Sequence, residues 1–121
     1  MSSTPRQVAE AFSGHRFREA YAVLAPDVRW ISVGQGTLTG REAVIEACEA
    51  TLGELASGTA EFQRFVVIAG TDAAAVDAVG RYVDAEGEVS LVSSCDIYEF
   101  GDGLVTSITS YAVELDPATG R

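Results

Sequence analysis

The chain is short of basic residues, because eight Lys and Arg stand against 18 Asp and Glu, a net charge of −10. A phosphate backbone or an anionic membrane surface would be repelled, so we expect no nucleic acid and no membrane among the partners. Only two cysteines are present, Cys48 and Cys95, and their spacing resembles neither a zinc site nor a disulfide framework. We expect both to be reduced, buried side chains, with no metal and no cofactor.

Long apolar runs are also missing, since none approaches the ~18 residues of a membrane-spanning helix. Met1–Pro5 has no apolar stretch behind a basic start, which is unlike a signal peptide, and we expect a cytoplasmic protein. The 121 residues are 47% hydrophobic and 21% charged. This composition predicts a single globular domain over residues 1–121, with its core from about residue 4 to residue 115.

Three helices are predicted in the first half of the chain. The first begins at the capping-box pattern of Thr4 and Gln7 and ends at Ser13-Gly14. A second, at about residues 16–24, is indicated by the helical spacing of Phe17, Ala20, Tyr21 and Leu24. A third runs from a second capping-box pattern, Thr39–Glu42, to about Leu55.

The strands follow mostly after the helices. A short strand is predicted at residues 28–33, and four long ones, separated by tight turns, at residues 59–69, 73–84, 89–100 and 104–114. Helices first and an antiparallel meander later indicate an α+β fold. We expect the long, twisted strands to form a strongly curved, mostly antiparallel mixed sheet that encloses a pocket against the three helices.

One carboxylate, Asp96, interrupts the alternating strand Val89–Phe100. In one interpretation burial raises its pKa, so that it donates a proton or hydrogen bond to a ligand carbonyl. In the other it is ionised and satisfied by Arg81 or by the hydroxyls of Ser94, Tyr98 and Ser110. The only histidine, His15, lies in a turn, and we interpret it as a surface or capping residue rather than a base.

Strand parity predicts which side chains line the pocket with Asp96. We expect the ligand-binding set to be Phe12, Phe17, Tyr21, Trp30, Ser32, Asp77, Arg81, Ser94, Tyr98 and Ser110. For Arg81 an ion pair at the strand end, and for Tyr21 a core position, stay open as alternatives. This mostly apolar lining suits a hydrophobic small molecule with a polar group. The opposite sheet face, with Leu91, Cys95 and Ile97, is expected to be covered by a second copy of the chain.

The order of these elements resembles the SnoaL-like (polyketide cyclase) branch of the nuclear-transport-factor-2-like superfamily. The resemblance rests on the segments Phe17–Trp30, Thr39–Val44 and Asp96–Val105 and covers about residues 8–115. It implies a cystatin-like cone of helices and curved sheet, a deep apolar pocket at the open end, and frequent homodimers. The superfamily holds isomerases, cyclases, hydrolases, dehydratases and non-catalytic binding domains, so fold alone does not name a reaction.

Three catalytic patterns of that superfamily fit this sequence only in part. Asp96 matches the oxyanion-hole acid of the ketosteroid isomerases, but Ser32 stands at their base position and Val8 at their tyrosine. The limonene-epoxide hydrolases and the SnoaL-type cyclases imply a carboxylate on the last strand, where this chain has Ser110. The position of the hydrolases' water-orienting aromatic falls on Trp30, which cannot accept a hydrogen bond.

Three functions follow as expectations. The chain is a cofactor-free isomerase or cyclase for a carbonyl-bearing hydrophobic ligand, with Asp96 as acid. Alternatively it is a pocket protein that binds such a ligand without turnover, or a dimerisation module.

Overall fold

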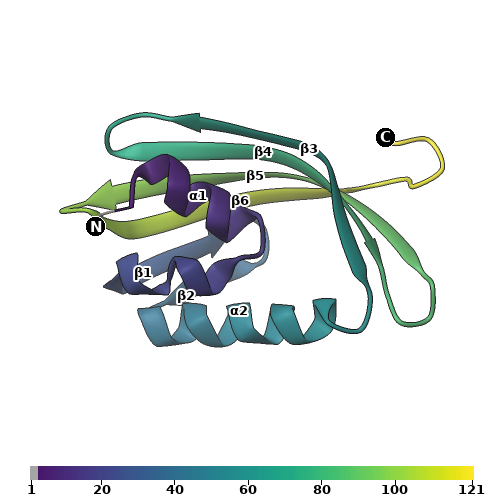
Figure 1. Ribbon diagram of the computed structural model, residues 1–121, viewed down its shortest axis with the longest axis horizontal. Coiled ribbons are helices and arrows are strands. Elements are labelled where there is room, and N and C mark those ends of the chain that lie inside the picture. Colours follow the sequence, from purple (N-terminus) through teal and green to yellow (C-terminus); the bar gives the residue numbers. More distant parts are fainter. Residues whose placement is uncertain (1–2) are drawn as a thin grey trace.

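The computed structural model describes residues 3–121 of the chain (Figure 1). Residues 1 and 2 lie outside the described residues, and with them the start of the Met1–Pro5 segment, which the sequence predicts is not a signal peptide. Two α-helices and a six-stranded sheet form an α+β fold, as predicted. Within residues 3–121 no helix is long and apolar enough to cross a membrane.

The first helix, α1, spans Pro5–Ser13 and has the predicted capping box. The Thr4 hydroxyl accepts from the Gln7 amide, and the Gln7 side chain accepts from the Thr4 amide. Its C-terminal turn differs from the expected glycine cap. Gly14 has an ordinary φ of −83° and is required because a Cβ there would lie 2.6 Å from the Glu10 carbonyl oxygen, whereas His15 adopts the left-handed φ of 66°.

The predicted second helix is wrong. Two 3₁₀ turns replace it, η1 at Phe17–Glu19 and η2 at Tyr21–Val23, and the fold therefore has two α-helices rather than three. Phe17 and Ala20, three residues apart, are both buried. That spacing fits the three residues per turn of a 3₁₀ helix, and the segment is too short to stabilise an α-helix by itself.

Strand β1, Leu24–Ser32, starts earlier than predicted. Strand β2, Gly36–Thr39, pairs with it antiparallel and is a strand that the sequence did not predict. Helix α2, Arg41–Leu55, follows and buries Val44 and Cys48. Its predicted capping box does not form, because the N-cap is Gly40 at φ 97° and no side chain caps it.

The four long strands are those predicted: β3 (Thr59–Ala69), β4 (Ala73–Val83), β5 (Val89–Gly101) and β6 (Leu104–Leu115). The sheet order is β2-β1-β6-β5-β4-β3, with β1 parallel to β6 and every other pair antiparallel. Both helices lie on the same side of the curved sheet, and the β4–β5 turn bends toward the C-terminal end of α2 (Figure 1). The core lies between the helices and this concave face.

Candidate functional site

Asp96 lies in the middle of β5 on the concave face of the sheet. Its neighbours across the sheet are Val76 on β4 and Ser110 on β6. The Ser13 hydroxyl, at the end of α1, donates to Asp96 Oδ2 at 2.7 Å, and the Ser110 hydroxyl donates to Oδ1 at 2.6 Å. The carboxylate is thus held from the helix side and from the sheet side.

Each of these two serines is itself oriented by an aromatic residue. Trp30 Nε1 can only donate, and it donates to Ser110 Oγ at 2.9 Å, so the Ser110 proton is free to point at Asp96. The Tyr98 hydroxyl hydrogen-bonds to Ser13 Oγ. Because the single Ser13 proton points at Asp96, Tyr98 is the donor of that pair. Two chains of hydrogen bonds, from Tyr98 through Ser13 and from Trp30 through Ser110, therefore end at Asp96. Both donate to its oxygens, an arrangement that suits the ionised carboxylate.

Aromatic rings surround this network. Phe12 makes edge-to-face contacts with Phe17, Trp30 and Tyr98, at centroid distances of 5.0, 5.1 and 6.0 Å. Phe12, Phe17 and Tyr98 are almost completely buried, so these three predicted ligand contacts are core side chains in the ligand-free chain. Burial raises the pKa of Tyr98 well above its ordinary value, and the Asp96 charge adds to the effect, so Tyr98 keeps its proton.

The histidine that the sequence placed at the surface is half-buried on the same side of the sheet. The His15 ring stacks on Phe62 with centroids 5.3 Å apart, and it meets Phe17 and Tyr82 edge to face. Its Nε2 atom lies 3.4 Å from the Tyr82 hydroxyl. Burial lowers the pKa of His15, and the negative charge of Asp96 partly opposes that shift.

Tyr82 reaches His15 by folding back along its own strand. A Cβ on residue 80 would lie 2.6 Å from the Tyr82 hydroxyl oxygen, so the ring occupies the space that Gly80 leaves open. Burial, and then the Asp96 charge, raises the pKa of Tyr82. The sequence did not indicate Gly80 or Tyr82 as site residues. The one local signal is that a glycine precedes a tyrosine by two positions, on the same face of the strand.

Two predicted site residues lie on the wrong face. Asp77 pairs with Cys95, and Arg81 pairs with Leu91, which places both on the convex side, opposite Asp96. Asp77 forms an exposed ion pair with Arg64 at 2.9 Å, and Arg81 is exposed. Neither can reach Asp96, and the concave positions of β4 are taken by small or aromatic residues: Ala74, Val76, Ala78, Gly80 and Tyr82.

Tyr21 lies away from the network. Its hydroxyl donates to Glu49 at 2.7 Å, and Arg18 binds the same carboxylate through two hydrogen bonds. These hydrogen bonds lower the pKa of Glu49 to about 2. The Tyr21 ring packs against the core while its hydroxyl faces this surface pair, so the core alternative describes it best.

Ser32 and Ser94 are half-buried on the concave face. Ser32 stands opposite Ser110, and Ser94 stands opposite Ala78 and Ala112. A hydroxyl at Ser32 beside the network cannot serve as a base at neutral pH, so the replaced carboxylate of the isomerase pattern has no equivalent there.

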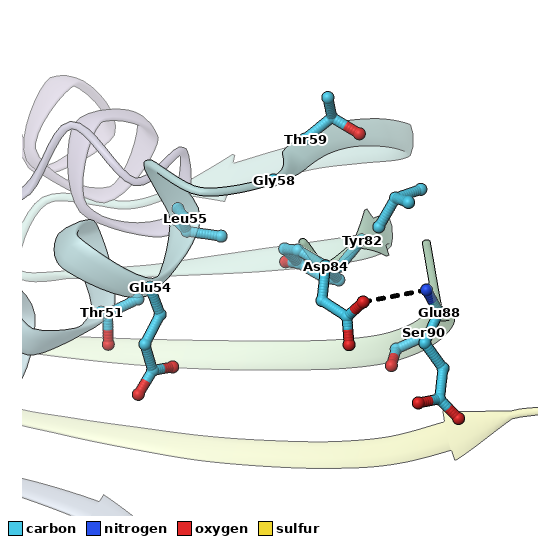
Figure 2. A pocket seen from close by; sticks show the side chains of 10 residues that line it. Thr51, Glu54, Leu55, Gly58, Thr59, Tyr82, Asp84, Glu88 and Ser90 are labelled. Carbon is cyan, nitrogen blue, oxygen red and sulfur yellow. Dashed lines mark hydrogen bonds between the residues drawn. The ribbon is translucent and has the colours of Figure 1, made fainter. Parts of the chain in front are cut away.

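A cavity of about 330 Å³ opens between the end of α2 and the β4–β5 turn (Figure 2). It is lined by Thr51, Glu54, Leu55, Gly58, Thr59, Tyr82, Val83, Asp84, Glu88 and Ser90. Five cavities open on the surface of the described part of the chain, this one included, and Asp96 lines none of these five. Tyr82 is the member of this cavity that also contacts His15.

Two features of residues 3–121 bear on metal and thiol chemistry. That part of the chain holds no group of three or more side chains placed to bind a metal ion. Both cysteines are free thiols. Cys48 is buried, as expected, whereas the expected burial of Cys95 is wrong, because Cys95 is half-buried on the convex face. Burial raises the pKa of Cys48 to about 12, so this thiol stays protonated.

Comparison with known families decides the classification. The SnoaL-like domain family matches residues 6–108. The chain belongs to this family. An NTF2-like protein of unknown function from Cytophaga hutchinsonii shares 31% identity with this SnoaL-like chain, over 88% of this chain and 93% of that one, with a TM-score of 0.76. The resemblance to the nuclear-transport-factor-2-like superfamily is therefore confirmed.

More distant solved structures share the fold of this SnoaL-like chain. A proposed polyketide cyclase from Xanthomonas campestris is 21% identical over 89% of this chain and 92% of its own, with a TM-score of 0.69. An LEH-like epoxide hydrolase from M. tuberculosis is 17% identical over 90% and 82%, with a TM-score of 0.68. No curated protein matches the chain.

Proposed function

We propose that this SnoaL-like chain binds a hydrophobic, carbonyl-bearing small molecule on the concave face of its sheet. It acts on that molecule as a cofactor-free isomerase or cyclase, with Asp96 as the carboxylate of the site. The observation that carries the proposal is the convergence of Ser13 and Ser110 on Asp96 inside an aromatic shell. This carboxylate is held by two elements and takes part in none of the ion pairs of the described residues, so its partial burial costs free energy, which supports a functional role.

The hydrogen bonds favour a particular role for Asp96. A protonated Asp96 would have to donate to a serine. If Ser110 accepted from both Asp96 and Trp30, its own proton would lose its acceptor. On the other side Ser13 would have to turn its proton toward Tyr98, leaving the buried tyrosine without an acceptor. In this proposal Asp96 therefore works as an anion that stabilises positive charge, in place of the acid expected from the isomerase pattern.

The relatives support the class of reaction. Solved structures with the same fold include a proposed polyketide cyclase and an LEH-like epoxide hydrolase, and these names support a small organic ligand in this proposal. In this proposal the ligand enters through the cavity between the end of α2 and the β4–β5 turn. Its volume of about 330 Å³ lies at the lower end of the range for ligand pockets.

The test is catalysed exchange of ketone α-protons for deuterium in D₂O, followed by proton NMR with 2-tetralone and 3-cyclohexen-1-one as probes. We expect the wild-type chain to accelerate exchange and Asp96→Asn to lose most of that acceleration. Asp77→Asn is the matched control, because it removes a carboxylate of the same sheet from the opposite face. Equal rates for the Asp96→Asn and Asp77→Asn variants would reject the role of Asp96.

The non-catalytic alternative is a protein that binds the ligand without turnover. It is favoured by one observation, the filling of the concave face by core aromatic rings. A ketone that raises the melting temperature without any exchange would select this alternative.

A homodimer through the convex face is part of the proposal. The large apolar side chains exposed there come from three strands: Val66, Ile68, Ile97, Tyr111 and Val113. Of the three residues expected at the contact, Ile97 is 36% exposed and Cys95 is half-buried, but Leu91 is only 5% exposed and is covered within the chain itself. These exposed apolar side chains share one face of the sheet, which supports a second copy of the same face as their cover.

A further inference from the structure

The proposed function leaves one chemical role open, and this inference rests on that function. Enolising a ketone requires a group that accepts a proton from carbon. Ser32 and Ser110 cannot do so at neutral pH. Each oxygen of Asp96 already accepts a serine hydrogen bond and has one lone pair left, and the proposed function gives Asp96 the role of the anion. Tyr82 and Tyr98 keep their protons, since burial raises the pKa of each.

We propose that His15 is the proton acceptor of this site, and that Tyr82 covers its Nε2 atom until the carbonyl group of a ligand takes over the Tyr82 hydrogen bond.

The His15 ring is held in position from several elements. Its backbone adopts a left-handed conformation at the end of α1, which turns the side chain toward the sheet. Phe62 of β3 stacks on one face of the ring, and Phe17 and Tyr82 contact it edge to face. A general base needs such a defined orientation, because proton transfer requires a short and directed contact with the reacting atom.

The surroundings of His15 suit both of its protonation states. Burial disfavours the charged ring, so the free side chain is neutral at pH 7 and has a lone pair to offer. The Asp96 charge acts in the opposite direction and stabilises the imidazolium that forms after proton transfer. Ser13, two residues before His15, ties the same turn to Asp96.

Tyr82 is the side chain that a ligand has to move. Its hydroxyl lies 3.4 Å from His15 Nε2, which is a long and weak hydrogen bond. Its ring packs over Gly80, where no side chain holds it in place. Tyr82 also lines the cavity of about 330 Å³, so a ligand in that cavity meets Tyr82 before it meets His15. Figure 2 shows Tyr82 among the residues that line this cavity.

The proposed step is a balanced proton shift. The Tyr82 hydroxyl donates to the ligand carbonyl oxygen instead of Nε2, with His15 carrying its own proton on Nδ1. Nε2 then takes a proton from the carbon beside the carbonyl, and the electron pair of that C–H bond forms the enolate. The imidazolium then returns the proton to carbon. With a β,γ-unsaturated ketone the anion is a dienolate, and protonation of its γ carbon gives the conjugated ketone and neutral His15 without an oxidant, a reductant or a metal.

The test uses the same exchange assay at several pH values, with 2-tetralone as the probe. A general base is typically worth a factor of ~10²–10⁴, so His15→Gln is expected to lower the exchange rate at least ~100-fold. Tyr82→Phe keeps the ring but loses the donor and is expected to show a smaller loss. Asp77→Asn is expected to keep the wild-type rate. A His15→Gln rate within about threefold of the wild type would overturn the inference.

A second measurement does not depend on any variant folding. Because the chain has a single histidine, the imidazole NMR signals belong to His15 alone. The groups facing it that carry or gain charge are Tyr82 from β4 and Asp96 from β5, while Phe62 and Phe17 are uncharged. Arg16, Arg18 and Glu19 line a surface cavity together with His15 and add charges on the solvent side. We expect the wild-type rate of exchange to fall at low pH with the pKa that NMR gives for His15, and a mismatch would overturn the inference. A wild-type chain that exchanges no ketone would overturn the proposed function as well, which is a distinct result.

Discussion

The Tyr82 hydroxyl lies 3.4 Å from Nε2 of His15, and the Tyr82 ring occupies the space that a side chain at Gly80 would fill. This relationship predicts the effect of Gly80→Ala. The new Cβ would lie 2.6 Å from the hydroxyl oxygen and must push the Tyr82 ring away. We expect the His15 imidazole signals to change and the pKa of His15 to move toward its ordinary value of about 6.5, because the ring gains solvent. Gly70→Ala is the control, since its nearest contact is 3.7 Å away, and identical His15 spectra for both variants would contradict this arrangement.

The burial of His15 predicts how stability depends on pH. Its pKa is lower in the folded chain than in the unfolded chain, so the unfolded chain binds more protons between these two values. The His15 contribution is therefore fully present above about pH 6.5 and is lost as the pH falls toward the folded pKa. Urea unfolding between pH 5 and pH 8 measures this. His15→Gln should remove the slope in that window, and an unchanged slope would show that another group causes it.

The hydrogen bonds of Asp96 predict a stability cost for removing it. Asp96→Ala would leave the Ser13 and Ser110 hydroxyls without their acceptor, and we expect a loss of about 1–3 kcal/mol in the free energy of unfolding. Asp77→Ala, which breaks an exposed ion pair with Arg64, is expected to cost about 0–1 kcal/mol. Equal losses in urea titrations would argue against a structured network at Asp96.

Much of the fold, but less of the site, could be predicted from the sequence. The four long strands alternate with period two between turn residues, and these local signals were sufficient for β3 to β6. The side of the sheet on which Asp96 lies followed from the same alternation. Asp77 and Arg81 were misplaced because both faces of β4 carry small or apolar residues, so the pattern could not show which face is buried.

Other features depend on contacts between distant segments. Ser13 and His15 lie 83 and 67 residues from their partners Asp96 and Tyr82, and no local pattern indicates either contact. The segment after His15 has helical spacing over only two turns, which packing converts into 3₁₀ turns.

The exposed apolar face predicts the oligomeric state. Light scattering after size-exclusion chromatography at micromolar concentration should give twice the chain mass of 12.7 kDa. Val113 is 63% exposed on that face, and Val113→Lys should shift the wild type toward the monomer. Ala50→Lys adds the same charge at an exposed position of α2, which covers the opposite face of the sheet, and should leave the dimer intact. A monomeric wild type would reject the dimer.

Helix α2 offers a prediction that is independent of the site. Gly53 lies inside this helix, and a Cβ there would meet nothing within 4 Å. Gly53→Ala is expected to raise the free energy of unfolding by about 0.5–1 kcal/mol. Gly58→Ala should destabilise the chain instead, because its Cβ would collide with the Val83 carbonyl oxygen. The same sign for both changes in thermal unfolding would contradict this packing.

The central claim is that a carbonyl-type ligand binds on the concave face, beside Asp96 and His15. Its most direct test is a titration of the ¹⁵N-labelled chain with 2-naphthol, an aromatic enol mimic, followed by NMR chemical shifts. The account predicts saturable shifts of the His15 imidazole together with the amides of Tyr82, Ser94 and Asp96. Shifts confined to the convex face around Ile97 and Tyr111, or no saturable shifts at all, would contradict it.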